Sequence, residues 1–115
     1  AVFCEWDRDA LLVLKKNIQK LGFDHQAKIL SGDITSLRTW HAPPAQLVLC
    51  DAPYDSGLTT KIIPRLAGLG ALQSTCIIAC EVRHSESVSL PDTFAPLDNR
   101  RYGMARLFFF RYQPA

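Results

Sequence analysis

Apolar runs alternate with amphipathic stretches along most of the chain. We expect strands over four apolar runs, at residues 1–5, 27–33, 45–51 and 74–82. The third of these, 45–51, is continuously apolar, which is typical of a strand in a sheet that is covered on both faces. Residues 94–113 favour two further strands around a turn near 99–103.

The polar and apolar spacing also predicts helices between the strands. One helix should begin after Asp7, a good N-cap, and end at Gly22. Its apolar face would consist of Leu11, Leu14, Ile18 and Leu21. We expect a short helical turn over 34–41 and a second helix over 58–70, which Pro64 should kink or shorten. Asp55 and Gly57 fit the cap and the hinge of that second helix.

This order of elements indicates an α/β fold. Alternating strands and helices predict a parallel sheet with helices on both faces, and the final hairpin adds an antiparallel edge. The 115 residues are within the usual size of one domain.

Composition narrows the class of protein further. The chain is 48% hydrophobic and 21% charged, which is globular composition, and no apolar run is long enough to cross a membrane. The spacing of the cysteines matches no zinc pattern, so we expect free, buried, intracellular thiols at Cys4, Cys50, Cys76 and Cys80. Four arginines follow the last acidic residue and favour phosphate binding or, alternatively, a solvated strand edge: Arg100, Arg101, Arg106 and Arg111.

An acidic residue ends each of the first four predicted strands. These residues are Glu5, Asp33, Asp51 and Glu81. The carboxyl ends of parallel strands share one edge of the sheet, where ligands bind, although a single acid there can also be a helix cap. Glu5 suits a ribose diol, and Asp33 with Ile34 suits an adenine. Trp6 could stack on that ligand, and core packing is the alternative for Trp6 and Ile34.

The tetrapeptide Asp51-Ala52-Pro53-Tyr54 fits a reaction at the exocyclic amine of a base. The Asp51 carboxylate and the Ala52 carbonyl could each accept one hydrogen of the amine. Pro53 stiffens the turn, and Tyr54 can stack on the base and hold it at the reaction distance. The alternative is an ordinary type I turn with an aspartate at its start.

These pieces together resemble a known family. The tetrapeptide resembles the D-P-P-Y motif of amino-methyltransferases that use S-adenosylmethionine. The chain as a whole resembles the RsmD type of bacterial small-subunit ribosomal RNA guanine-N2 methyltransferases. Four further segments carry this resemblance: "VFCEWDRDALLVLKKNIQKLG", "SGDITSL", "ACE" and "NRRYGMARLFFFRY". The resemblance implies a Rossmann-like class I methyltransferase sheet, mostly parallel, with a C-terminal antiparallel hairpin.

The resemblance also implies roles for single residues. Asp51, Ala52, Pro53 and Tyr54 would be catalytic, and Glu5, Trp6, Asp33 and Ile34 would bind S-adenosylmethionine. Arg100 and Arg101 would contact phosphates of ribosomal RNA or of the small ribosomal subunit. The methyl group would pass directly to guanine N2, with no metal, in a cytoplasmic monomer away from membranes. Two alternatives stay open: a non-catalytic RNA-binding relative, and an amino-methyltransferase that acts on adenine N6 or a protein amide.

The chain departs from the family pattern in two places. Ala52 stands where the family has proline, so we expect a looser turn that keeps its backbone carbonyl. A Gly-rich cofactor loop is missing, and so is the strand that precedes this loop in the family. We therefore expect one methyltransferase domain, residues 1–115, that is the C-terminal portion of a longer domain and is incomplete at its N-terminal strand. This portion alone should bind S-adenosylmethionine weakly or not at all.

Overall fold

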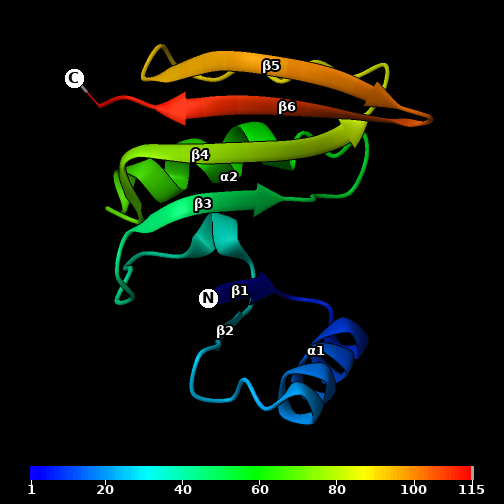
Figure 1. Ribbon diagram of the computed structural model, residues 1–115, viewed down its shortest axis with the longest axis vertical. Helices are drawn as coiled ribbons and strands as arrows, with labels where there is room; N and C mark the ends of the chain where they lie inside the picture. Colours follow the sequence, from blue (N-terminus) through cyan, green and yellow to red (C-terminus); the bar gives the residue numbers. More distant parts are fainter. Residues whose placement is uncertain (115) are drawn as a thin grey trace. The chain divides into compact units, whose positions relative to one another are not determined.

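The computed structural model describes residues 1–114 and divides into two compact units, Ala1–Arg38 and a second that begins at Thr39 (Figure 1). The first unit contains β1 (Val2–Glu5), α1 (Arg8–Leu21), β2 (Lys28–Ser31) and the 3-10 helix η1 (Ile34–Ser36). Strands β1 and β2 pair in parallel, with Val2 opposite Lys28 and Glu5 opposite Ser31.

Helix α1 begins and ends where the sequence predicts. The Asp7 carboxylate accepts a hydrogen bond of 2.8 Å from the Ala10 amide and so satisfies a free donor of the first turn. Gly22 ends the helix in the left-handed conformation at φ 74°, and its amide donates to the Gln19 carbonyl at 3.1 Å.

The second unit contains β3 (Ala45–Cys50), α2 (Leu58–Gly68), β4 (Leu72–Arg83), β5 (Phe94–Tyr102) and β6 (Ala105–Tyr112). Its sheet has the order β3-β4-β6-β5. Strands β3 and β4 are parallel, and β6 runs antiparallel to both β4 and β5. Figure 1 shows α2 behind this sheet, against β4. The predicted parallel pairs and the C-terminal hairpin are therefore confirmed. Pro64 lies inside α2, which ends at Gly68.

The core lies in the second unit. Alternate residues of β4 are buried, as expected for one face of a strand. They are Cys76, Ile78, Cys80 and Val82. Ile63 and Leu66 of α2 and Phe110 of β6 are also buried. Because Phe110 is the register partner of Ile78, one sheet face and α2 share this core.

Two predictions of burial are wrong. Leu47 and Leu49 of β3 are 58% and 75% exposed, so β3 is not covered on both faces. Phe3 and Cys4 of β1, which pairs with β2 alone among the described strands, are exposed as well. On α1, three residues of the predicted apolar face, Leu11, Leu14 and Ile18, are half-buried, whereas Leu21 is exposed.

Two of the parallel strands have an edge without a pairing partner. Within residues 1–114, β1 pairs only with β2 and β3 pairs only with β4. One edge of β1 and one edge of β3 are therefore unpaired. These strands lead to Glu5 and Asp51, two of the residues to which the sequence assigns ligand binding.

Truncation of the core at Ile78 should destabilise the protein. Ile78 is 0% exposed, so Ile78→Ala should lower the free energy of unfolding by about 2–5 kcal/mol. Chemical denaturation measures this change. Leu97→Ala on β5, where the side chain is 45% exposed, is the matched control and should cost less than about 1 kcal/mol. Equal losses in the two variants would contradict this description of the core.

Candidate functional site

The register of β3 and β4 brings two carboxylates together. Leu49 lies opposite Ala79 and Cys50 lies opposite Cys80, so the next residues, Asp51 and Glu81, extend the same parallel pair. Both follow buried cysteines, and their side chains therefore lie on the face opposite those cysteines. The carboxyl ends of β3 and β4 thus place Asp51 beside Glu81, as the sequence predicts for this pair.

The carboxyl groups of Glu81 and Asp51 interact with each other. The Glu81 side chain is hydrogen-bonded to Asp51, and this bond is the main reason why the pKa of Glu81 is raised; the negative charge of Asp51 and burial add to it. Glu81 therefore keeps its proton to a higher pH than an isolated glutamate does.

The chain turns sharply after Asp51. The Ser56 hydroxyl donates to the Pro53 carbonyl at 2.6 Å and accepts from the Leu58 amide at 3.3 Å. Gly57 is the N-cap residue of α2; it has φ 68°, and no side chain caps the helix. The expectation that Asp55 caps this helix is wrong, because its carboxylate instead binds the Arg83 guanidinium at 2.9 Å.

Tyr54 lies beneath a cation from the next strand. The Arg83 Cζ atom is 5.1 Å from the centre of the Tyr54 ring, within the range of a cation–π contact. Burial is the largest cause of a raised pKa of the Tyr54 phenol. The negative charges of Glu81 and Asp51 raise it further, and Arg83 opposes them. The aromatic ring therefore lies within the electrostatic field of the carboxylate pair.

The first unit contains the residues that the sequence assigns to a cofactor. Glu5 ends β1, and Asp33 follows the end of β2, at the same edge of the parallel pair. The Glu5 carboxylate accepts from the Trp6 amide at 2.9 Å. Trp6 is 67% exposed, so it is not a core residue, and Ile34 is half-buried.

Asp33 caps η1 in addition to any role in binding. It accepts from the amide and the hydroxyl of Thr35 at 2.9 and 2.7 Å, and the hydroxyl bond is the main reason why the pKa of Asp33 is lowered. These bonds involve one carboxylate oxygen, Oδ1, while a carboxylate can accept about four hydrogen bonds. Two carboxylates at one strand edge, beside an exposed indole, thus fit a nucleoside.

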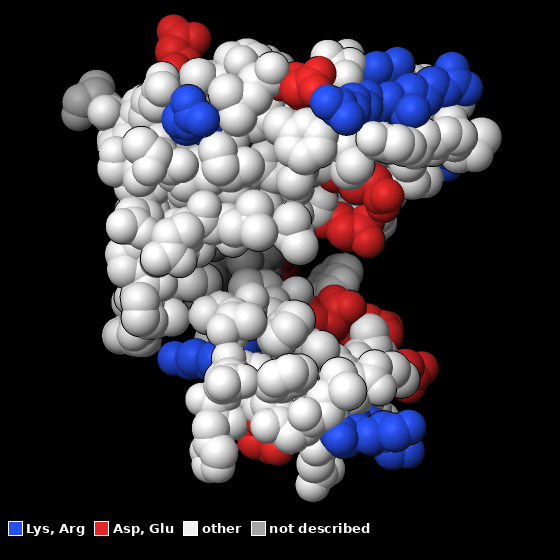
Figure 2. All heavy atoms as spheres, in the orientation of Figure 1, with Lys and Arg blue, Asp and Glu red and all other residues white. Residues whose placement is uncertain are grey.

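The C-terminal hairpin separates the two arginines that the sequence groups together. Register places Glu81, Leu107 and Arg100 in one row across β4, β6 and β5, on the face that carries Asp51. Arg101 lies on the opposite face, directly across from Arg106. Figure 2 shows basic side chains gathered over the end of this hairpin.

Local contacts orient these arginines. Arg100 Nε bonds to Asp98 at 2.9 Å, which is the main reason why the pKa of Asp98 is lowered, and Arg101 Nε donates to the Gly103 carbonyl at 3.0 Å. Arg106 donates to Asn99 at 2.7 Å. The Arg100 side chain remains 64% exposed and can meet a further anion.

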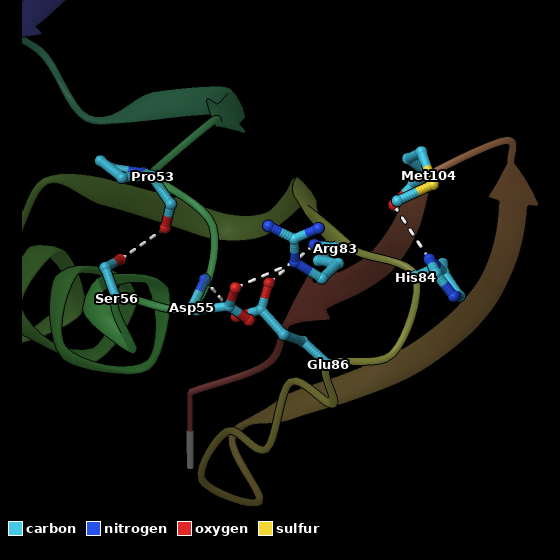
Figure 3. A network of polar contacts seen from close by, with 7 residues as sticks. All are labelled: Pro53, Asp55, Ser56, Arg83, His84, Glu86 and Met104. Carbon is cyan, nitrogen blue, oxygen red and sulfur yellow. Dashed lines mark hydrogen bonds and ion pairs between the residues drawn. The ribbon is translucent and has the colours of Figure 1, made fainter.

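Sequence reasoning gave no role to Arg83 or Glu86, which lie next to the motif. The Glu86 carboxylate accepts from the Asp55 amide at 3.0 Å and from the Arg83 amide at 2.7 Å (Figure 3). The sequence contains one signal for a role of Arg83, its position two residues after the strand-end acid Glu81. Its ion-pair partner Asp55, however, lies 28 residues earlier in the chain. In the part of the chain that the structure describes, no three His, Cys, Asp or Glu residues are grouped to hold a metal ion, and neither helix is long and apolar enough to span a membrane.

Comparison with solved structures shows the same fold elsewhere. A Haemophilus influenzae protein described as a candidate methylase superposes with a TM-score of 0.85 at 21% identity, over 98% of this chain and 72% of that one. An Escherichia coli candidate methyltransferase superposes with a TM-score of 0.81 at 20% identity, over 100% of this chain and 63% of that one. TrmN from Thermus thermophilus superposes with a TM-score of 0.77 at 19% identity, over 96% of this chain and 36% of that one. At these identities, the likeness shows the fold alone.

Sequence comparison defines the family. A comparison with curated proteins found no match. Residues 1–111, which include the carboxylate pair, the motif turn and almost all of the hairpin, match the model of the family described as conserved hypothetical protein 95. The chain therefore belongs to this family, the RsmD family, and has the Rossmann-like fold of class I methyltransferases.

Proposed function

We propose that this chain carries the amine-binding part of an S-adenosylmethionine-dependent methyltransferase that modifies guanine N2 in small-subunit ribosomal RNA. The observation that carries the proposal is the position of Asp51 at the carboxyl end of β3, beside Glu81 and three residues before Tyr54. A carboxylate accepts hydrogen bonds from an exocyclic amine, and an adjacent aromatic ring stacks on the base that carries this amine.

Asp51 and Glu81 divide two tasks in this proposal. The amine nitrogen is a poor nucleophile because its lone pair is delocalised into the ring. A hydrogen bond to Asp51 directs the lone pair and returns electron density to nitrogen. After the new N–C bond forms, the nitrogen carries one proton too many. A carboxylate of the Asp51–Glu81 pair can accept this proton, and the raised pKa of Glu81 favours proton uptake there.

Residues of the first unit fit the methyl donor. Glu5 would bind its ribose hydroxyls, Asp33 and Ile34 would frame its adenine, and Trp6 would add a stacking surface. When S-adenosylmethionine is bound, it supplies an electrophilic methyl group on a sulfonium. A free strand edge such as that of β1, or that of β3, can pair with a further strand.

The hairpin supplies cations for the RNA backbone. Two strand spacings, about 10 Å, separate Arg100 from Glu81 along their row, so Arg100 could bind a phosphate near the target base. On the other face, Arg101 and Arg106 lie directly opposite each other, although like charges in this arrangement are destabilising. An anionic partner such as RNA would relieve that repulsion.

Asp51→Ala tests the catalytic role. In the full-length protein, this change should lower guanine methylation by at least about 10²-fold, because it removes the hydrogen-bond acceptor and proton acceptor. Affinity for S-adenosylmethionine should stay within about twofold of the original, since Asp51 does not bind that ligand in this proposal.

Mass spectrometry of the nucleosides should detect N2-methylguanosine, and Asp92→Ala in an exposed loop is the control. Near-normal turnover would contradict the role of Asp51, and N6-methyladenosine would identify another substrate.

The carboxylate pair can be tested by titration. Asp51→Asn replaces the carboxylate whose hydrogen bond and negative charge raise the pKa of Glu81, so this pKa should fall toward its usual value in ¹³C NMR spectra. In the unaltered protein, the folded state binds the Glu81 proton more tightly than the unfolded chain does. The free energy of unfolding should therefore fall as the pH rises through the raised pKa. Asp51→Asn should weaken that dependence, and Asp92→Asn should leave it unchanged. An unaltered Glu81 pKa in Asp51→Asn would show that the pair does not form.

The two faces of the hairpin predict different results for neighbouring arginines. Arg100→Glu and Arg101→Glu should each weaken RNA binding and reduce its salt slope by about one unit. Because Arg100 shares the face of Asp51, Arg100→Glu should cause the larger loss of methylation. Filter binding at several salt concentrations and methylation rates measure these effects. Unchanged salt slopes would contradict RNA binding by the hairpin, and equal losses of methylation would contradict the assignment of faces.

A further inference from the structure

Asp55, directly after Tyr54, has an unusual backbone conformation. Its φ is 60°, in the left-handed region that residues other than glycine seldom adopt. Such conformations persist where surrounding contacts hold them, and they gather at functional sites. The contacts that hold Asp55 therefore also determine where the Tyr54 ring lies.

Two side chains from the end of β4 hold Asp55. The Arg83 guanidinium binds the Asp55 carboxylate, with 2.9 Å between Nε and Oδ2. The Glu86 carboxylate accepts from the Asp55 amide through one oxygen, at 3.0 Å, and from the Arg83 amide through the other, at 2.7 Å. Glu86 thus joins the motif turn to the segment that carries Arg83 (Figure 3).

Arg83 contacts the ring itself as well. Its guanidinium carbon lies 5.1 Å from the centre of the Tyr54 ring, on one face of that ring. A planar guanidinium can bind a carboxylate along one edge while it stacks on an aromatic ring. The ammonium of a lysine, a single point charge, cannot do both in the same way.

The same segment is anchored to the hairpin. The His84 amide donates to the Met104 carbonyl at 2.7 Å, next to the turn between β5 and β6. The cation over Tyr54 therefore has a fixed support in the sheet. Because the Arg83 and Asp55 side chains are 36% and 60% exposed, their ion pair adds little to folding stability, so its placement needs another explanation.

From this network, we infer that Arg83 is a positioning residue for base binding: it covers one face of the Tyr54 ring, holds Asp55, and leaves the other face of the ring to the target base. This inference rests on the proposed function, because the base is the guanine that Asp51 receives. Arg83 acts through Tyr54 and Asp55, and Glu86 supports it.

Two measurements on the full-length protein test this inference. Arg83→Ala should raise the pKa of the Tyr54 phenol further in ¹³C NMR spectra, because the nearby cation that favours the phenolate is removed. The same variant should lower kcat for guanine methylation by about 10-fold to 100-fold, with KM for RNA changed by less than about threefold, because the base binds but is misplaced. Arg83→Lys should restore only part of kcat. Lys61→Ala, which removes a positive charge from an exposed position of α2, should change neither measurement.

The outcomes separate this inference from the proposed function. A Tyr54 pKa that does not move in Arg83→Ala would overturn the contact with the ring, whatever reaction the protein catalyses. A shifted pKa with unchanged kcat would overturn the positioning role. If the unaltered protein forms no N2-methylguanosine although Arg83→Ala shifts the Tyr54 pKa, the contact exists and the proposed function fails.

Discussion

The candidate site depends on the parallel register between β3 and β4. Because Cys50 lies opposite Cys80, the next residue of each strand is a carboxylate, and the two meet on the face opposite the buried cysteines. A shift of one residue in either strand would turn one carboxylate toward the core. The buried cysteines and Ile78 therefore do more than fill the core, since their burial fixes which face receives Asp51 and Glu81.

The two faces of this sheet have separate tasks. One face packs against α2 and contains the core of the second unit. The other carries Asp51, Glu81 and Arg83 at the ends of the parallel strands and Arg100 on β5, in positions fixed by register. Exposed Leu47 and Leu49 continue this second face along β3. A nucleotide that places its base at Asp51 and a neighbouring phosphate at Arg100 would lie along this surface.

Local sequence was enough to predict what local chemistry decides. The caps of α1, the strand-end acids and the final hairpin follow from side-chain chemistry and periodicity, and the structure contains them. Burial of Leu49 and Cys4 was predicted wrongly because it depends on which elements cover a strand. The roles of Asp55 and Arg83 depend on a contact between residues 28 positions apart, which no local pattern indicates. The separation of Arg100 from Arg101 could be predicted only once the strand pairing was known.

The central claim is that the turn after β3 receives the exocyclic amine of a guanine. NMR spectroscopy of an RNA with ¹⁵N-labelled guanine amino groups, bound to the full-length protein, observes this contact directly. The account predicts that the amino protons of the target guanine shift downfield on binding to the unaltered protein, because a carboxylate accepts their hydrogen bond. The shift should disappear when Asp51 is replaced by alanine. Amino resonances that stay unchanged in a complex that otherwise forms would contradict the account.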